Sequence, residues 1–396
     1  PIARQQVASK SKVHLRPSSM AAACETVIQP DIAYLLMRAL PLQDALRLVR
    51  VCNAWRLASR EAWGSPTLLR TTPRTIEGSL AEGQHGDLGT FEWPNDVKLL
   101  PDGNICVVES STVEGKRRLQ IFSPEFERVR EVHCPFPLCY PESPGNPGDG
   151  RFVAAAACHD ALFVAFYFPG CAGDSGRLYK FSLPECVLLE VLRGAYPSEQ
   201  SEDEDEDEGW AQYFCAVEDL LVIGERLFVL DRGGELGEPS VVVFDFSLHY
   251  LFTFGQGDDS RHYQTVIPGG ELSGPTSIAS HAGLIYIAEK LANRISVFNV
   301  AGQFERLVLC NGELFEGPLC VAFARDRMLV GESQQHSWWI RNATTSLVRI
   351  LTIDGVLLQT LKLTFSPLSL CVHEAQDQVY AADLLGNKLH VLSLLS

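Results

Sequence analysis

The chain has 396 residues, a mean hydropathy of +0.03 and a charged fraction of 21%, values typical of a globular protein with a sizeable core. Its longest apolar stretch, Val153 to Phe168, is interrupted by His159 and Asp160 and is too short to span a bilayer. Residues 1–20 lack the apolar core of a secretory signal, and the twelve cysteines form no CxxC pairs, so we expect reduced thiols and a cytoplasmic or nuclear location.

The net charge of −16 is unevenly distributed along the chain. Residues 1–70 carry ten Lys/Arg against four Asp/Glu, which leaves 23 basic and 45 acidic side chains, a net charge of −22, for the remainder. A surface of this sign repels a phosphate backbone, so the composition argues against a nucleic-acid partner.

The N-terminal part of the chain divides into a tail and a helical segment. We expect residues 1–24 to be a disordered tail, because they are polar and show no apolar periodicity. Residues 25–69 contain few turn residues and carry apolar side chains at helical spacing, which predicts a small all-α module. The apolar positions of its two expected helices are Ile32, Leu35 and Leu36, then Ala45, Leu46, Leu48, Val49 and Cys52.

Residues 70–396 repeat one pattern six times. The copy at 94–132 reads as a strand, a Pro-Asp-Gly-Asn turn, a second strand, a loop, a third strand, a short turn and a fourth strand. The ends of the second strands are spaced by 57, 65, 58, 43 and 51 residues, at Glu109, Phe166, Asp231, Glu289, Glu332 and Asp383. Four-stranded repeats of this length predict a mainly β fold, a six-bladed β-propeller.

The last copy ends directly after its third strand, whereas the other five have a fourth. An unpaired outer edge favours aggregation, so a segment from elsewhere in the chain should cover it. We predict that Arg74 to Leu80 supplies this strand by pairing with Lys388 to Leu394.

Two family resemblances extend this interpretation. The copies at 94–132 and 274–309 resemble NHL repeats, and they lack the GH and WD pairs of WD repeats and the GG doublets of kelch repeats. Residues 28–59 (IQPDIAYLLMRALPLQDALRLVRVCNAWRLAS) resemble an F-box, although the usual leading Leu-Pro is replaced by Ile28-Gln29. A plain helical cap on the propeller is the alternative for this segment.

The F-box resemblance implies that the segment binds a Skp-type adaptor, and through it a cullin. The positions that match the family pattern and would form the apolar contact surface are Ile32, Leu36, Leu40, Leu46, Leu48, Val51, Cys52 and Trp55. The chain would then be the target-binding subunit of an SCF-type ubiquitin ligase, with no catalytic residues and no cofactor of its own. The target would bind the propeller loops.

The acids that end five of the second strands are the most prominent candidate site: Glu109, Asp231, Glu289, Glu332 and Asp383. One interpretation is a calcium site like that of propeller lactonases. The other, which we favour, is structural, with each acid accepting hydrogen bonds from backbone amides of the following loop. Because we find no metal-ligand set or nucleophile motif, we expect no metal site.

The run Glu202 to Glu208 consists of seven consecutive acidic residues. Like charges at this density cannot pack together, so we expect a disordered, solvated loop near 195–209. The alternatives to a ligase subunit are a non-enzymatic protein-interaction scaffold, a propeller hydrolase and an RNA-binding NHL protein.

Overall fold

The computed structural model describes residues 68–69, 74–77, 91–110, 117–133, 151–167, 176–194, 214, 216–233, 238–257, 270–333 and 346–395. All of them belong to one of the two units into which the chain divides, Leu68–Leu395. The predictions for the tail (1–24), the acidic loop (195–209) and the F-box-like module lie outside the described residues, except for Leu68 and Leu69.

The described chain forms six antiparallel sheets, which we call blades 1 to 6 in chain order. Blade 1 contains β3 (Pro94–Leu99), β4 (Ile105–Glu109), β5 (Arg118–Phe122) and β6 (Arg128–His133). Blade 2 contains β7 (Arg151–Ala157), β8 (Ala161–Tyr167), β9 (Gly176–Ser182) and β10 (Leu188–Arg193). Blade 3 contains β11 (Val217–Ile223), β12 (Arg226–Asp231), β13 (Ser240–Asp245) and β14 (Tyr250–Phe254).

The second half of the unit continues the same order. Blade 4 contains β15 (Pro275–His281), β16 (Leu284–Glu289), β17 (Arg294–Asn299) and β18 (Phe304–Val308). Blade 5 contains β19 (Pro318–Ala324), β20 (Arg327–Ser333), β21 (Ser346–Thr352) and β22 (Leu357–Leu363). Blade 6 contains β23 (Ser369–His373), the short 3-10 helix η2 (Glu374–Gln376), β24 (Gln378–Asp383) and β25 (Lys388–Leu395).

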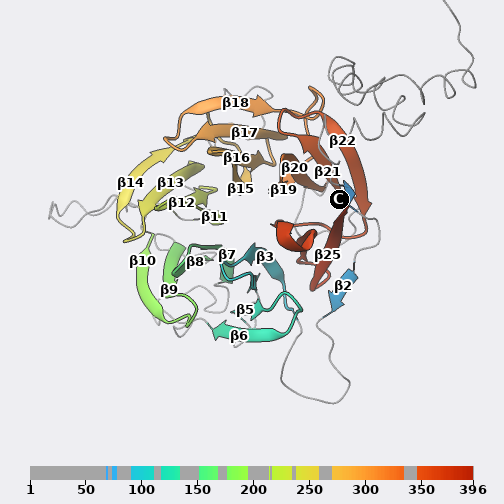
Figure 1. Ribbon diagram of the computed structural model, residues 1–396. Helices are drawn as coiled ribbons and strands as arrows, with labels where there is room; N and C mark the ends of the chain where they lie inside the picture. Colours follow the sequence, from blue (N-terminus) through green and yellow to red (C-terminus); the bar gives the residue numbers. More distant parts are fainter. Residues whose placement is uncertain are drawn as a thin grey trace, which may run out of the picture. The chain divides into compact units, whose positions relative to one another are not determined.

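The first strands of the blades surround a common axis. Each contacts the first strand of the next blade, in the cyclic order β3, β7, β11, β15, β19, β23 and back to β3. The fourth strands β6, β10, β14, β18 and β22 lie at the perimeter (Figure 1). This arrangement confirms the predicted six-bladed β-propeller.

The predicted closure of the ring is also confirmed. Strand β2 (Arg74–Glu77) pairs with β25 from Arg74↔Val391 to Glu77↔Lys388 and completes blade 6. The structure adds a second short strand, β1 (Leu68–Leu69), which pairs with Leu394 and Leu395. Leu68 and Leu69 therefore extend the propeller edge, although we assigned them to the end of the helical module.

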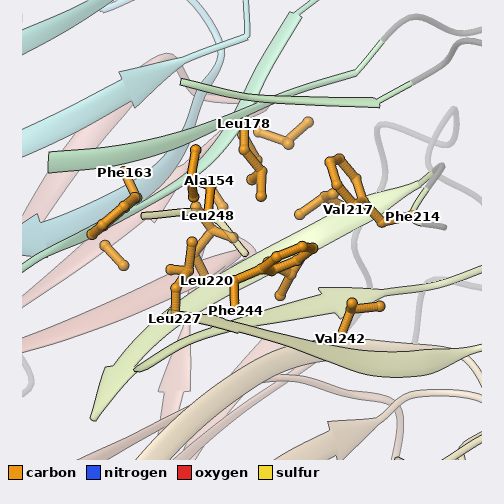
Figure 2. Close-up of a cluster of buried hydrophobic side chains, with 14 of the residues drawn as sticks. Ala154, Phe163, Leu178, Phe214, Val217, Leu220, Leu227, Val242, Phe244 and Leu248 are labelled. Atoms are coloured by element: carbon orange, nitrogen blue, oxygen red, sulfur yellow. The ribbon is translucent and has the colours of Figure 1, made fainter. Parts of the chain in front are cut away.

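The core consists of six hydrophobic clusters, one between each pair of neighbouring blades. Figure 2 shows the cluster between blades 2 and 3, where Phe163 and Leu178 meet Leu220, Leu227 and Phe244. Because side chains alternate along a strand, the middle strands supply residues to both neighbours. This explains why these strands read as continuous apolar runs in the sequence.

No helix in the described part of the chain is both long and apolar enough to cross a membrane.

Candidate functional site

The residues predicted to bind an adaptor, from Ile32 to Trp55, lie outside the described residues. The other predicted group, the five acids at the ends of the second strands, is described completely. None of these five side chains lines the central cavity described below. Each instead forms contacts within its own blade or with the segments that flank the strands of that blade.

Glu109 and Glu289 show the role of these acids most clearly. Glu109 accepts hydrogen bonds from the Glu92 amide at 2.5 Å and from Arg118 Nε at 2.6 Å. Glu289 accepts from the Ser273 amide at 2.8 Å and from Arg294 Nε at 3.0 Å. Burial raises the pKa of both carboxyls, and the arginines offset part of this effect. Both acids therefore connect the third strand of a blade to the segment that precedes its first strand.

The structural interpretation of the acids fits these contacts, but the predicted donors were partly wrong. For Glu332, as for Glu109 and Glu289, the donor amide precedes the first strand of the blade, at Glu316. Asp231 accepts from the Ala216 amide, which precedes the first strand of its blade, and from the Gly233 amide in the following loop. Asp383 accepts from the following Gly386 at 3.0 Å, as predicted. Acids occupied in this way are poorly suited to form the calcium site of the lactonase interpretation.

A cavity of about 430 Å³ lies on the propeller axis. All six blades contribute to its walls through their first strands or the residues just before them: Asn95, Val153, Val217, Thr276, Leu319 and Leu368. Trp93, Glu218 and Arg232 also line it. Glu218 pairs with Arg232 at 3.0 Å, and the Trp93 side chain is 38% exposed. A cavity of this size falls within the range of small-ligand sites in proteins.

One position in each first strand places a side chain next to a neighbouring blade, and in four of the six blades this side chain also lines the axial cavity. In five of the six blades, an irregularity in the register with the second strand precedes this position and changes the alternation of side chains. The six residues at this position are Asp96, Ala154, Asp219, Ser277, Cys320 and Ser369. Except for Ala154, they connect neighbouring blades through hydrogen bonds.

The two aspartates hold the adjacent blades directly. Asp96 accepts from Ser369 Oγ of blade 6 at 2.6 Å and from the Ala155 amide of blade 2 at 3.0 Å. Asp219 accepts from the Ile278 amide of blade 4 at 3.0 Å. Both carboxyl groups are almost completely buried. These bonds satisfy carboxylates that burial would otherwise strongly destabilise.

The remaining members continue the connection around the axis. Ser277 Oγ donates to Asp219 at 3.0 Å and accepts from the Val321 amide of blade 5 at 3.4 Å. Cys320 Sγ donates to the Pro367 carbonyl, which precedes blade 6, at 3.3 Å. Hydrogen bonds from this one position therefore connect five of the six neighbouring pairs of blades.

Lys98 lies between the two buried aspartates. Its Nζ donates to Asp219 Oδ1 at 2.8 Å and lies 3.4 Å from Asp96 Oδ1. Burial alone would lower the pKa of Lys98, but the two carboxylates raise it above its ordinary value. Burial raises the pKa of Asp96, and the nearby Asp219 adds to the rise while Lys98 opposes it. The axis thus holds two acids and one cation.

This cluster is not among the sites predicted from the sequence. A signal was present, because Asp96 and Lys98 are charged residues in a strand that contacts other strands on both sides. Aligning the repeats at this position would have placed Asp96, Asp219, Ser277 and Ser369 together. Among the described residues, no group of three or more His, Cys, Asp or Glu side chains is placed to hold a metal ion.

The RNA-binding alternative would need a basic surface, for which the candidates are the basic residues near the starts of the third strands: Arg117, Arg118, Arg177, Arg294 and Lys388. Arg118 pairs with Glu109 and Arg294 with Glu289, and Arg117 and Arg177 are buried. Charges that are neutralised inside blades do not form a basic surface for a phosphate backbone.

No protein-family pattern matches the chain, and no curated protein is similar to it at a significant level. Among solved structures, a streptogramin B lyase is similar at 11% identity and a TM-score of 0.47, covering 82% of this chain and 98% of that one. Hydrazine synthase from Kuenenia stuttgartiensis is similar at 10% identity and a TM-score of 0.47, covering 80% of this chain and 99% of that one. Likenesses at this level carry no information about function.

Proposed function

We propose that this protein is the target-binding subunit of an SCF-type ubiquitin ligase. In this proposal the F-box-like segment binds a Skp-type adaptor, and the propeller binds the protein to be modified. The propeller fold itself is consistent with a protein-interaction scaffold. The observation that carries the finer proposal is the F-box-like sequence at 28–59, which ends nine residues before the strand that begins the propeller at Leu68.

The mechanism is proximity. The adaptor and cullin bring the conjugating enzyme, and the propeller holds the target on the same chain, which raises the effective concentration of the target lysine. No side chain of this protein needs to take part in bond formation. The buried acids of the blades then serve the rigidity of the ring.

The test is co-purification of the full chain with a Skp-type adaptor. A Leu46→Asp/Val51→Asp double variant places two charges on the expected apolar contact surface. Burial of such charges costs about 3 kcal/mol or more, which is on the order of a 100-fold loss of affinity. A Gln43→Asp/Asn53→Asp double variant is the matched control, because it adds the same charge at polar positions of the same segment.

We expect the wild type and the control to bind the adaptor and the Leu46→Asp/Val51→Asp variant to lose binding while its propeller keeps its unfolding temperature. Absence of binding by the wild type would contradict the ligase proposal and favour a scaffold without an adaptor. Equal binding by all three chains would assign the contact to a different surface.

A propeller hydrolase is the remaining alternative from a different class. Metal analysis of the purified protein and assays on generic lactone and ester substrates test it directly. A stoichiometric metal together with turnover would overturn the ligase proposal.

A further inference from the structure

The charges of the described residues around the axial cavity are unevenly distributed. Three carboxylates line it, those of Asp96, Glu218 and Asp219, and one of them is paired with Arg232 at 3.0 Å. Lys98 lies between the other two and compensates one of them. The amine of Lys290 also interacts electrostatically with Glu218, so among the described residues the excess negative charge is confined to the Asp96–Asp219 side of the cavity, where it favours a cationic group.

The hydrogen bonds of the aspartates locate an acceptor for such a ligand. Asp219 Oδ1 accepts from Lys98 and the Leu220 amide, and Asp219 Oδ2 accepts from Ser277 and Ile278. Among the described residues, Asp96 Oδ2 accepts one bond, from the Ala155 amide, and a carboxylate oxygen can accept another. A single acceptor position suits an ammonium group better than a guanidinium, whose parallel donors favour a carboxylate with both oxygens available.

The rest of the cavity matches the stem of a lysine side chain. Its lining includes the apolar side chains Val153, Val217, Leu319 and Leu368, which can contact a chain of methylene groups. Trp93, exposed at 38%, adds an aromatic surface of the kind that peptide-binding sites use.

We propose that the axial cavity binds a lysine side chain of the target protein, with its ammonium group on Asp96 and its methylene stem against the apolar walls. This inference rests on the proposed function, in which the propeller holds a protein target. The bound lysine is a recognition residue: its amine is buried in the cavity, so the lysine that receives ubiquitin lies elsewhere in the target.

The test measures binding of capped, fluorescein-labelled peptides to the full chain by fluorescence polarisation. The probe is Gly-Gly-Lys-Gly-Gly, and the comparison peptides carry norleucine, which keeps the stem without the charge, or glutamate in place of lysine. We expect the lysine peptide to bind at least tenfold more tightly than either. Equal binding of the norleucine peptide, or no binding of the lysine peptide, would overturn the inference.

Two charge reversals on one blade provide matched variants. Glu218 lines the cavity at the start of β11, whereas Glu225 lies in the exposed turn at the opposite end of the same strand, roughly 20 Å away. We expect Glu218→Lys to weaken binding of the lysine peptide at least fivefold. Glu225→Lys should leave the affinity for this peptide within twofold of the wild-type value. Equal losses from both variants would show a general charge effect and contradict the site.

Two further measurements separate the possible sources of failure. If n-pentylamine competes as strongly as the lysine peptide, the cavity is a site for small amines and the inference about a protein target is wrong. The same protein samples are tested for adaptor co-purification. Loss of peptide binding with adaptor binding retained would overturn the lysine site alone, whereas loss of adaptor binding would contradict the proposed function.

Discussion

At the scale of single residues, the most consequential feature of the propeller is the ammonium group of Lys98 between two buried carboxylates. Its distances of 2.8 and 3.4 Å to Asp219 and Asp96 join residues that are 121 and two positions apart in the chain. A buried group of this kind contributes little net stability compared with an apolar replacement, but loss of one member leaves the others uncompensated.

We predict that Lys98→Met lowers the free energy of unfolding at pH 7 by about 3 kcal/mol, because two neighbouring carboxylates then lack a cation. The pKa of Asp96 is already raised above its ordinary value in the folded state, and loss of Lys98 raises it further. Because the pKa of Asp96 is higher in the folded state than in the unfolded state, the folded state takes up a proton at a higher pH. The ionised carboxyl therefore costs stability at neutral pH, and this cost is removed as the pH falls toward 4.

Urea unfolding of both proteins between pH 7 and pH 4.5 measures this effect. The difference in the free energy of unfolding between wild type and Lys98→Met should shrink as the pH falls. Lys98→Arg, which keeps the charge, should differ much less from the wild type. Cys371 does not contribute in this range, because burial raises the pKa of its thiol to about 12. A deficit that stays constant with pH would show that Lys98 acts through packing.

The acids at the strand ends could be predicted from the sequence because they recur at one place in each repeat. The axial cluster is harder to predict, because its position holds a different residue type from blade to blade and becomes visible only when the repeats are aligned. The register irregularity between Pro94 and Asp96 changes which side chains face the axis, and simple alternation along the strand does not reveal it. The partner of Lys98 is in a different blade, so local spacing contains no information about it.

At the scale of the strands and turns, the blades share one design with local substitutions. Blade 2 has Phe166 where the other blades have an acid, and its ring lies 5.2 Å from Phe152 and 6.1 Å from Tyr179 in edge-on contacts. An aromatic cluster there takes the place of the hydrogen-bonded acid. This explains why blade 2 is the weakest copy in the sequence, although its strands are paired as in the others.

Glycine is required in these turns for two different reasons, a positive φ angle and a close contact with a neighbouring blade. Gly283, in the turn between β15 and β16, and Gly302, in the turn between β17 and β18, have φ angles of +77° and +80°. A Cβ on Gly283 would meet open space, whereas a Cβ on Gly302 would lie 2.7 Å from the ring of Phe254 in blade 3. Gly302 therefore serves both the turn and the contact between blades.

We predict that Gly283→Ala lowers the free energy of unfolding by about 1 kcal/mol, the cost of a positive φ at a residue with a side chain. Gly302→Ala should cost about 1–3 kcal/mol more, because overpacking against Phe254 adds to the same backbone cost. Thermal or urea unfolding of the two variants measures the difference. A Phe254→Leu background should reduce the excess at Gly302, and equal costs for both glycines would show that the contact relaxes freely.

At the scale of the whole propeller, the ring is closed by strands from both ends of the described chain. The contact of β23 with β3 brings blade 6 against blade 1, and β2 and β1 cover the outer edge of β25. This long-range pairing could be predicted because a missing strand is visible as an interruption of a regular pattern. The short strand β1 could not be predicted, because two leucines carry too little pattern to be recognised as a strand.

We predict that removal of these two strands destabilises the ring. A chain that begins at Leu68 keeps β1 and β2, and a chain that begins at Gly78 lacks both. Four residue pairs join β2 to β25, and at about 1 kcal/mol for each ladder hydrogen bond their loss should lower the unfolding temperature by roughly 6 °C. The exposed edge of β25 should also make the shorter chain self-associate.

Thermal unfolding and size-exclusion chromatography of the two chains measure these effects. A synthetic peptide of residues 68–77, added to the shorter chain, should raise its unfolding temperature and restore the monomer, and a scrambled peptide of the same composition should do neither. The added peptide can succeed because ladder pairing does not require a continuous chain, although it must overcome the entropy of association. If both chains unfold at the same temperature as monomers, contacts between the first strands of the blades are sufficient to close the ring.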